Sequence, residues 1–194
     1  VGIQDHTTSD TFISSAYPKV NYWLDPSLIT GKQIYYGTTR SLVKFNLKNL
    51  LSGANITSAN LKLSSHSNLN GFDHSANIGV YPISKPWASD SATWSNQPSI
   101  ESQVSNLNVT KDNEYTFFMT NLVKEWYSGK KANHGIMLIN GNETVNRKMF
   151  RSSDYSTDPL KKPKLTVVYT IEPIGVESFW TSAGSNVNTY NGNF

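Results

Sequence analysis

Short stretches that alternate apolar and polar residues, bounded by Gly, Pro, Asn and Ser, dominate this chain. Successive side chains of an extended strand point to opposite faces, so a period of two indicates strands with one buried face. Such stretches occur at residues 10–15, 33–37, 41–47, 56–65, 77–84, 114–119, 135–140, 147–153 and 164–170. Many short strands separated by turn residues predict an all-β fold, either an antiparallel sandwich or a barrel.

One segment has a helical period instead. Its apolar residues recur at spacings of three and four, as on one face of a helix: Met119, Leu122, Val123 and Trp126. We predict a short α-helix at about 119–129 that caps one end of the β-structure. Thr120 is the expected N-cap, Gly129 the expected stop and Trp126 an anchor in the core.

The strand expected at 41–47 has two chemically different faces. One face is apolar enough to be core and comprises Ser41, Val43, Phe45 and Leu47. The other face comprises Arg40, Leu42, Lys44 and Asn46. Two cations on the same side of one strand repel each other unless an anion lies nearby. Two explanations stay open for this second face: a platform for an anionic ligand, or a solvated outer surface.

Composition excludes several functional classes. The net charge of +3 is too small to predict nucleic-acid binding. Cysteine is absent, which excludes disulfides and cysteine-based metal sites, and no apolar run approaches the ~20 residues that span a bilayer. The histidines show no metal-ligand spacing, and neither a nucleophile elbow nor a phosphate loop occurs. We therefore name no catalytic residue and expect a protein that is not an enzyme.

The chain divides into a folded domain and a polar tail. We predict one sandwich domain at residues 1–171, followed at 172–194 by a linker and the start of a further segment. Because the sequence begins with Val1 and lacks a signal-like stretch, we interpret it as part of a longer protein.

Six motifs occur in a recognisable order: "DTFISSAYPKVNY", "RSLVKFNL", "ITSANLKL", "VYPISKPWASDSATWSNQP", "FMTNLVKEWYSGKKANHGIMLI" and "RKMFRSSDYSTDPLKKPKLTVVY". This order resembles the DNRLRE domain family, which is similar to carbohydrate-binding modules. The tail "ESFWTSAGSNVNTYNGNF" resembles the junction after the wall-binding repeats of Gram-positive cell-wall-associated YD-repeat (RHS) toxin proteins. One departure from the family pattern is the loop Trp23-Leu24-Asp25-Pro26, where members commonly have small and polar residues.

The resemblance implies an antiparallel jelly-roll-like β-sandwich with a non-catalytic role in attaching a secreted bacterial protein to glycans of the cell wall. The implied partners are a cell-wall polysaccharide or another anionic glycan and the remainder of the parent protein. Two alternatives are a structural spacer or protein-interaction domain of a polymorphic toxin and, third, a polysaccharide lyase or hydrolase.

Basic and aromatic side chains are the candidate glycan contacts. Arg pairs with carboxylate or phosphate groups through two hydrogen bonds, Lys supplies a point charge, and aromatic rings stack on sugars. The basic candidates are Arg40, Lys44, Arg147, Lys148 and Arg151, and the aromatic candidates are Tyr22, Trp23 and Tyr155. Trp87 and Trp94 are interpreted as fixing a long loop against the core. The chain lacks the Asp-x-Asp-x-Asp calcium loop, but a structural Ca²⁺ stays an alternative, with Asp10, Asp73, Asp154 and Asp158 as candidate ligands.

Overall fold

The computed structural model describes residues 2–6, 8–66, 75–110, 112–144 and 147–172. Its strands are β1 (Gly2–His6), β2 (Thr8–Ser14), β3 (Ser27–Gln33), β4 (Gly37–Phe45), β5 (Ala54–Ser64), β6 (Ala76–Pro82), β7 (Ser105–Val109), β8 (Glu114–Phe118), β9 (Ile136–Asn140), β10 (Lys148–Arg151) and β11 (Lys164–Ile171). The helices are α1 (Thr120–Tyr127) and the 3₁₀ turns η1 (Trp94–Asn96) and η2 (Pro159–Lys161).

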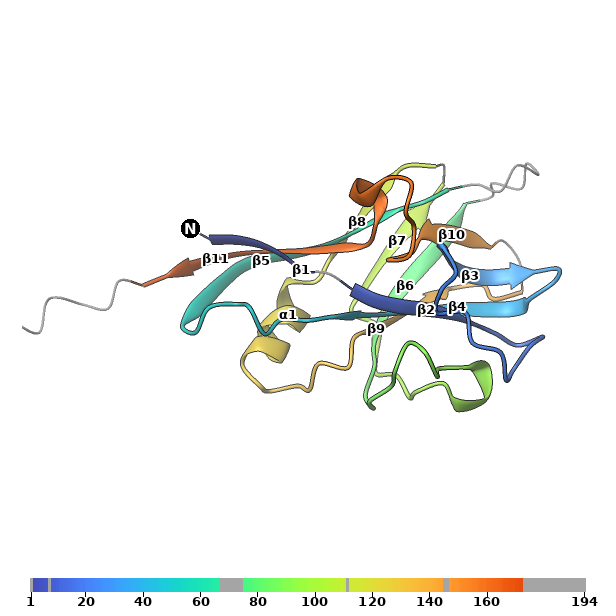
Figure 1. Ribbon diagram of the computed structural model, residues 1–194. Coiled ribbons are helices and arrows are strands. Elements are labelled where there is room, and N and C mark those ends of the chain that lie inside the picture. The colour runs from blue at the N-terminus through green and yellow to red at the C-terminus, as the bar shows by residue number, and fades with distance from the viewer. Residues whose placement is uncertain (1, 7, 67–74, 111, 145–146, 173–194) are drawn as a thin grey trace, which may run out of the picture.

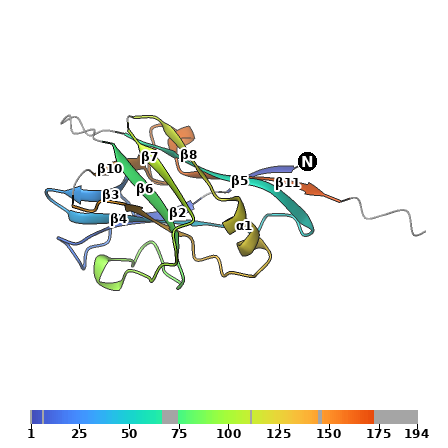
Figure 2. The same cartoon turned by 180° about the vertical axis from the view of Figure 1, so that it is seen from behind.

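The strands form two antiparallel sheets (Figures 1 and 2). The small sheet has the order β1-β11-β5-β8, and the large sheet has the order β10-β3-β4-β9-β6-β7, with β2 also paired to β4. The prediction of an all-β sandwich with one short helix is confirmed. Within the described part of the chain, no helix is both long and apolar enough to cross a bilayer.

The prediction of a strand at 33–37 is wrong, because residues 34–36 form the hairpin turn that joins the end of β3 at Gln33 to the start of β4 at Gly37. The Gln33 side-chain oxygen accepts hydrogen bonds from the backbone N–H groups of Tyr35 (2.6 Å) and Tyr36 (2.7 Å). Gly37 closes the turn with a φ of 67°. β3 itself is not among the predicted strands, because both of its faces are buried and its sequence therefore does not alternate.

The main core lies between the two sheets. Phe45 and Leu138 from the large sheet pack with Leu61 and Val167 from the small sheet. Helix α1 adds Leu122, Val123 and Trp126 to this cluster, as its apolar stripe predicts. Thr120 is the first helical residue rather than the N-cap, and its hydroxyl accepts a hydrogen bond from the backbone N–H of Ala59 (3.0 Å). The helix is thereby tied to β5, and Gly129 follows it with a φ of 74°.

A second hydrophobic cluster covers the opposite face of the large sheet. It contains Leu42, which is fully buried, together with Ile13, Ile83, Ala92 and Met137. The long connection between β6 and β7, which carries η1, supplies part of this cluster and lies across β4 and β9 (Figure 1). The half-buried rings of Trp87 and Trp94 pack on it, in agreement with their interpreted role. Leu42 on this face is therefore covered, whereas Arg40 and Lys44 are half-buried and Asn46 is exposed, so a solvated outer surface describes only the end of the face near Asn46.

Candidate functional site

Two open depressions meet at Ser9 and Lys44. One has a volume of about 380 Å³ and is lined by Ser9, Trp23, Lys44, Trp87, Ala88, Ser89 and Asp90. The other has a volume of about 750 Å³ and is lined by Ser9, Lys44, Phe45, Asn46, Leu47, Lys48, Trp126, Tyr127 and Asn133. We call the two together the Lys44 groove. Ser9 and Lys44 are direct partners in the antiparallel register of β2 and β4, which places both side chains on the same face.

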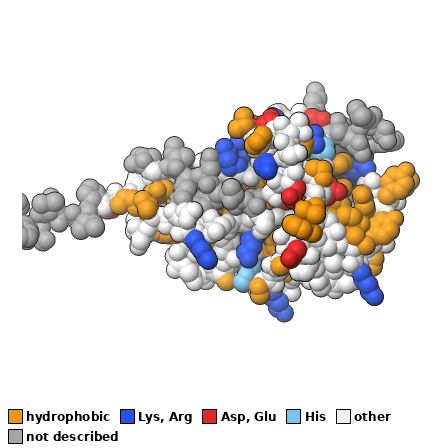
Figure 3. Space-filling view, viewed as in Figure 1, with side chains coloured by type: hydrophobic (Ala, Val, Ile, Leu, Met, Phe, Trp, Pro, Cys, Tyr) orange, Lys and Arg blue, Asp and Glu red, His pale blue; other side chains and the backbone are white. Residues whose placement is uncertain are grey.

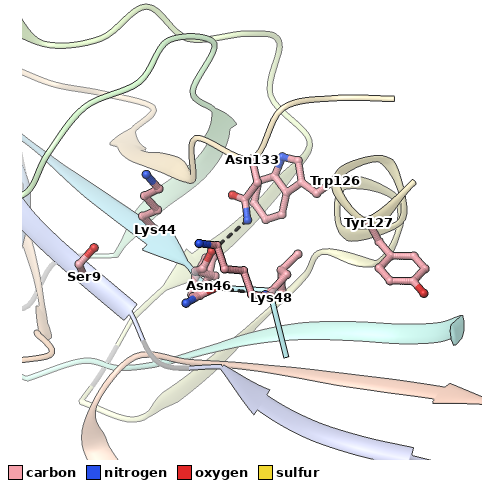
Figure 4. Close-up of a pocket in the computed structure, with 9 residues that line it drawn as sticks. Ser9, Lys44, Asn46, Lys48, Trp126, Tyr127 and Asn133 are labelled. Carbon is pink, nitrogen blue, oxygen red and sulfur yellow. Dashed lines mark hydrogen bonds between the residues drawn. The ribbon is translucent and has the colours of Figure 1, made fainter. Parts of the chain in front are cut away.

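Lys44 is the candidate cation that the fold leaves available. Its side chain is half-buried at the end of β4 and extends away from the strand in Figure 4. Among the residues that the structure describes, no ion pair or hydrogen bond neutralises its ammonium group. Lys48, at the wider end of the groove, is exposed. The acidic residue of the groove lining is Asp90.

Trp23 and Trp87 line the narrower end of the groove. Trp87 is fixed by a hydrogen bond from its Nε1 to the His134 carbonyl oxygen (2.7 Å). Trp23 is 43% exposed, and Asn21 anchors its loop by donating through Nδ2 to the carbonyl oxygens of Ser89 (2.8 Å) and Ala92 (2.7 Å). Asn21 therefore joins the loop of Trp23 to the loop of Trp87. The Trp23 loop thus contributes an aromatic edge to the groove.

Amide groups and the end of α1 shape the wider part of the groove (Figure 4). Asn133 Nδ2 donates to the Phe45 carbonyl oxygen (2.9 Å), which fixes the segment between α1 and β9 beside the end of β4. The Asn46 side-chain oxygen accepts from the backbone N–H of Lys48 (3.0 Å). Trp126 is 6% exposed, and its buried Nε1 has no hydrogen-bond partner in the described structure. The groove therefore combines amides, aromatic carbon and cationic groups.

Arg40, the second cation predicted on the same face, lies outside this groove and is already neutralised. Its Nε and Nη2 donate to the two carboxylate oxygens of Glu143 (2.7 and 2.9 Å), and its Nη1 donates to Gln97 (2.9 Å). The guanidinium also lies 5.0 Å from the centre of the Trp94 ring. The hydrogen bonds that Arg40 donates to Glu143 raise the pKa of the guanidinium. The guanidinium is thus engaged within the protein and bridges β4, the covering loop and the segment after β9.

The other basic candidates are not brought to the Lys44 groove. Lys148 is only 4% exposed, and its ammonium group donates to the Thr110 carbonyl oxygen (2.9 Å). Arg151 lies over the Tyr155 ring at 4.0 Å from its centre, so these two candidates contact each other. Arg147 is half-buried just before β10. On the face shown in Figure 3, basic side chains are dispersed rather than gathered into a single field.

Tyr22 is also placed away from the groove. Its ring stacks on Phe12 with the ring centres 4.2 Å apart, and Tyr36 packs edge-on at 5.4 Å. Burial raises the pKa of the Tyr22 hydroxyl. The rings of this cluster lie next to the tip of the β3–β4 hairpin, where Ile34 is 87% exposed and Tyr35 is 72% exposed. Hydrophobic side chains gather at this end of the molecule in Figure 3.

The candidate calcium ligands that the structure describes belong to no cluster of three. Asp10 is buried and accepts hydrogen bonds from the backbone N–H (2.9 Å) and hydroxyl (3.1 Å) of Ser153. Asp158 caps η2 by accepting from the backbone N–H of Leu160 (3.0 Å), and Asp154 is exposed. Asp73 lies outside the described residues. Where the structure is described, no three acidic or histidine side chains gather as they would around a metal ion, and the calcium site stays a prediction.

Comparison with known proteins identifies the family. The model of carbohydrate-binding module family 96 matches residues 3–169, nearly the whole described chain. The chain belongs to this family. Membership supports the carbohydrate-binding role that the motif order implies, and it favours a binding module over an enzyme. Polar groove residues that the sequence analysis did not single out include Ser9, Lys48, Ser89, Asp90, Tyr127 and Asn133.

This family 96 module is also similar to segments of much longer proteins. It is 30% identical over 177 residues to "tRNA nuclease WapA" of Bacillus subtilis (strain 168) and to "tRNA3(Ser)-specific nuclease WapA" of Bacillus spizizenii. Each match covers 84% of this chain but only 7% of the relative. The predicted division at residue 171 stays a prediction, because residues 173–194 lie outside the described part of the chain.

Proposed function

We propose that this chain is a non-catalytic module that attaches a larger secreted protein to the bacterial cell wall by binding an anionic polysaccharide in the Lys44 groove. The observation that carries the proposal is the Lys44 ammonium, which has no protein partner in the described structure and lies where two aromatic-lined depressions meet. Uronic acids and teichoic-acid phosphates supply the negative charge that such a group attracts.

The groove has the other contacts that a sugar chain requires. The exposed ring of Trp23 offers an apolar surface for the carbon–hydrogen face of a sugar. Asn46 and Asn133 line the same groove and place amide groups beside it, and the Ser9 hydroxyl lies next to Lys44. Because both depressions are open to solvent, the groove suits an internal segment of a polymer, which enters and leaves at the surface.

A charge-matched pair of variants tests this site. The full chain would be titrated calorimetrically with tetragalacturonate at low salt and at about 0.5 M salt. We expect Lys44→Gln to weaken binding about tenfold, which corresponds to ~1.4 kcal/mol, and to reduce the salt dependence. The melting temperature should not change, since Lys44 has no intramolecular partner in the described structure.

Lys32→Gln is the matched control, because Lys32 is an exposed residue of β3. This substitution removes the same charge from a position outside the groove. Equal affinity of the two variants for the uronate, or no uronate binding by the unmodified chain at low salt, would contradict the proposal.

A second candidate function is that of a spacer within a polymorphic toxin of the wall-associated YD-repeat class. The small fraction of each nuclease relative that this chain matches favours it, since the rest of such a protein would carry the effector. Crosslinking of the module to neighbouring domains of the parent protein, combined with a failure to bind purified cell walls, would support the spacer function over wall attachment.

A further inference from the structure

A separate depression lies beside the β6–β7 edge of the large sheet. Its volume is about 490 Å³, and it is lined by Ser75, Ala76, Asn77, Gln103, Asn106, Asn140, Gly141 and Asn142. Every polar side chain in this lining is an uncharged amide or hydroxyl, so the chemistry differs from that of the Lys44 groove. We call this depression the amide pocket.

The strand register separates the two sites. Val43, next to Lys44, pairs with Ile136 at the start of β9, whereas Asn140 ends β9. Four residues of extended strand span roughly 13 Å, and the amide pocket lies on the far side of β9 from β4. The described linings of the two sites have no residue in common. A ligand in the amide pocket therefore does not depend on Lys44.

Several amide groups in the pocket are available to a ligand. In the described structure the exposed side chains of Asn77 and Asn106 have no hydrogen-bond partner. The Gln103 side-chain oxygen accepts from the Tyr81 hydroxyl (2.9 Å), which leaves its NH₂ group to donate. The Asn142 oxygen likewise accepts from the backbone N–H (3.1 Å) and hydroxyl (2.6 Å) of Thr144. Two of the amides are thereby oriented with their donors free.

The backbone around the pocket is held in place by its own hydrogen bonds. The N–H of Gly141 donates to the Asn77 carbonyl oxygen (2.8 Å), and the N–H of Asn142 donates to the Asn140 side chain (3.0 Å). Gly79 permits the Tyr81–Gln103 contact to lie against the sheet, because an added Cβ would overlap both side chains. The polar groups are therefore presented from a rigid frame, which lowers the entropic cost of binding.

We propose that the amide pocket is a second glycan-binding site, which takes an uncharged sugar through its hydroxyl or acetamido groups. Amides offer both hydrogen-bond donors and acceptors, as sugar hydroxyls and acetamido groups do. The lining contains no cationic side chain that would attract an anion. An acetamido group is itself an amide, whose N–H can donate to one side-chain oxygen while its carbonyl oxygen accepts from another side-chain NH₂ group. The two sites would let one module contact two chemically different glycans.

The test uses the isotope-labelled full chain and two neutral probes, chitotetraose, which has acetamido groups, and cellotetraose, which has only hydroxyls. We expect at least one probe to shift the side-chain NH₂ resonances of Asn77 and Asn106. A preference for chitotetraose would assign the contact to the acetamido group, and equal binding would assign it to hydroxyls.

Asn106→Ala should weaken this binding about tenfold, whereas Asn108→Ala on the same exposed face of β7 should not, because Asn108 does not line the pocket. Lys44→Gln should leave the affinity for neutral sugar unchanged. Absence of shifts at 10 mM of both probes, equal losses in the two Asn variants, or a loss in Lys44→Gln would overturn the proposal.

Discussion

At the scale of single residues, Arg40 and Lys44 show how one strand face can give two cations different roles. Both project from the same side of β4, but Arg40 donates a hydrogen bond to Gln97 of the covering loop, whereas Lys44 lines an open depression beside residues 87–90 of that loop. Glu143 and Gln97 occupy the guanidinium of Arg40. The Lys44 ammonium has no ion-pair or hydrogen-bond partner in the described structure and faces solvent in the groove. The role of each cation is therefore decided by what covers it.

Arg40→Ala is expected to destabilise the fold rather than leave the melting temperature unchanged, as a ligand-contacting residue would. The side chains of Arg40 and Glu143 are each about a quarter exposed, so their ion pair is largely shielded from solvent. The substitution also removes the contact of the guanidinium with the Trp94 ring. We expect a loss of about 1–2 kcal/mol in the free energy of unfolding. A double-mutant cycle with Glu143→Gln, measured by urea denaturation, would give the coupling. An unchanged urea midpoint for Arg40→Ala would contradict this role.

At the scale of elements, the entry into β9 depends on a close approach to β4. Gly135 has a φ of 81°, its N–H donates to the Asn133 side chain (3.1 Å), and its carbonyl oxygen accepts from Ile83 (3.0 Å). A Cβ at this position would overlap the Val43 carbonyl oxygen. The glycine therefore lets the segment that carries Asn133 pass against the end of β4, where the Lys44 groove lies.

Gly135→Ala should therefore lower the free energy of unfolding by about 3 kcal/mol or more, which exceeds the loss expected from an unfavourable positive φ alone. The matched control is Gly53→Ala, because Gly53 has a similar φ of 77° but open space around an added Cβ. Its expected cost is about 1–2 kcal/mol. Thermal denaturation of both variants would separate backbone overlap from backbone strain, and equal losses would show that the overlap is relieved.

At the scale of the whole molecule, the central strands β3, β4 and β9 of the large sheet are mostly buried on both faces. The small sheet and α1 cover one face, and the loop that carries Trp87 and Trp94 covers much of the other. This second cluster holds the loop against β4, and the loop in turn forms the narrower end of the Lys44 groove. Binding geometry and stability are therefore linked through the same loop.

Leu42→Ala should destabilise the protein by about 2–5 kcal/mol, because Leu42 is fully buried in the second cluster. Leu51→Ala removes the same groups from a side chain that is 56% exposed, and it should change stability by less than about 1 kcal/mol. Equilibrium denaturation of the two variants checks this difference. A loss below 1 kcal/mol for Leu42→Ala would mean that the covering loop does not form a core.

The sequence by itself determined the class of fold, the capping helix and the resemblance to carbohydrate-binding modules, because alternation, helical spacing and motif order are local patterns. It also placed Arg40 and Lys44 on one face and selected Trp23. Only the tertiary structure decided which of the two cations is free, since Glu143 lies 103 residues from Arg40 along the chain. Trp87 and Asn133, which line the groove, are likewise held by hydrogen bonds to residues 47 and 88 positions away along the chain. Such pairings arise from the packing of loops on the sheet, for which no local pattern exists.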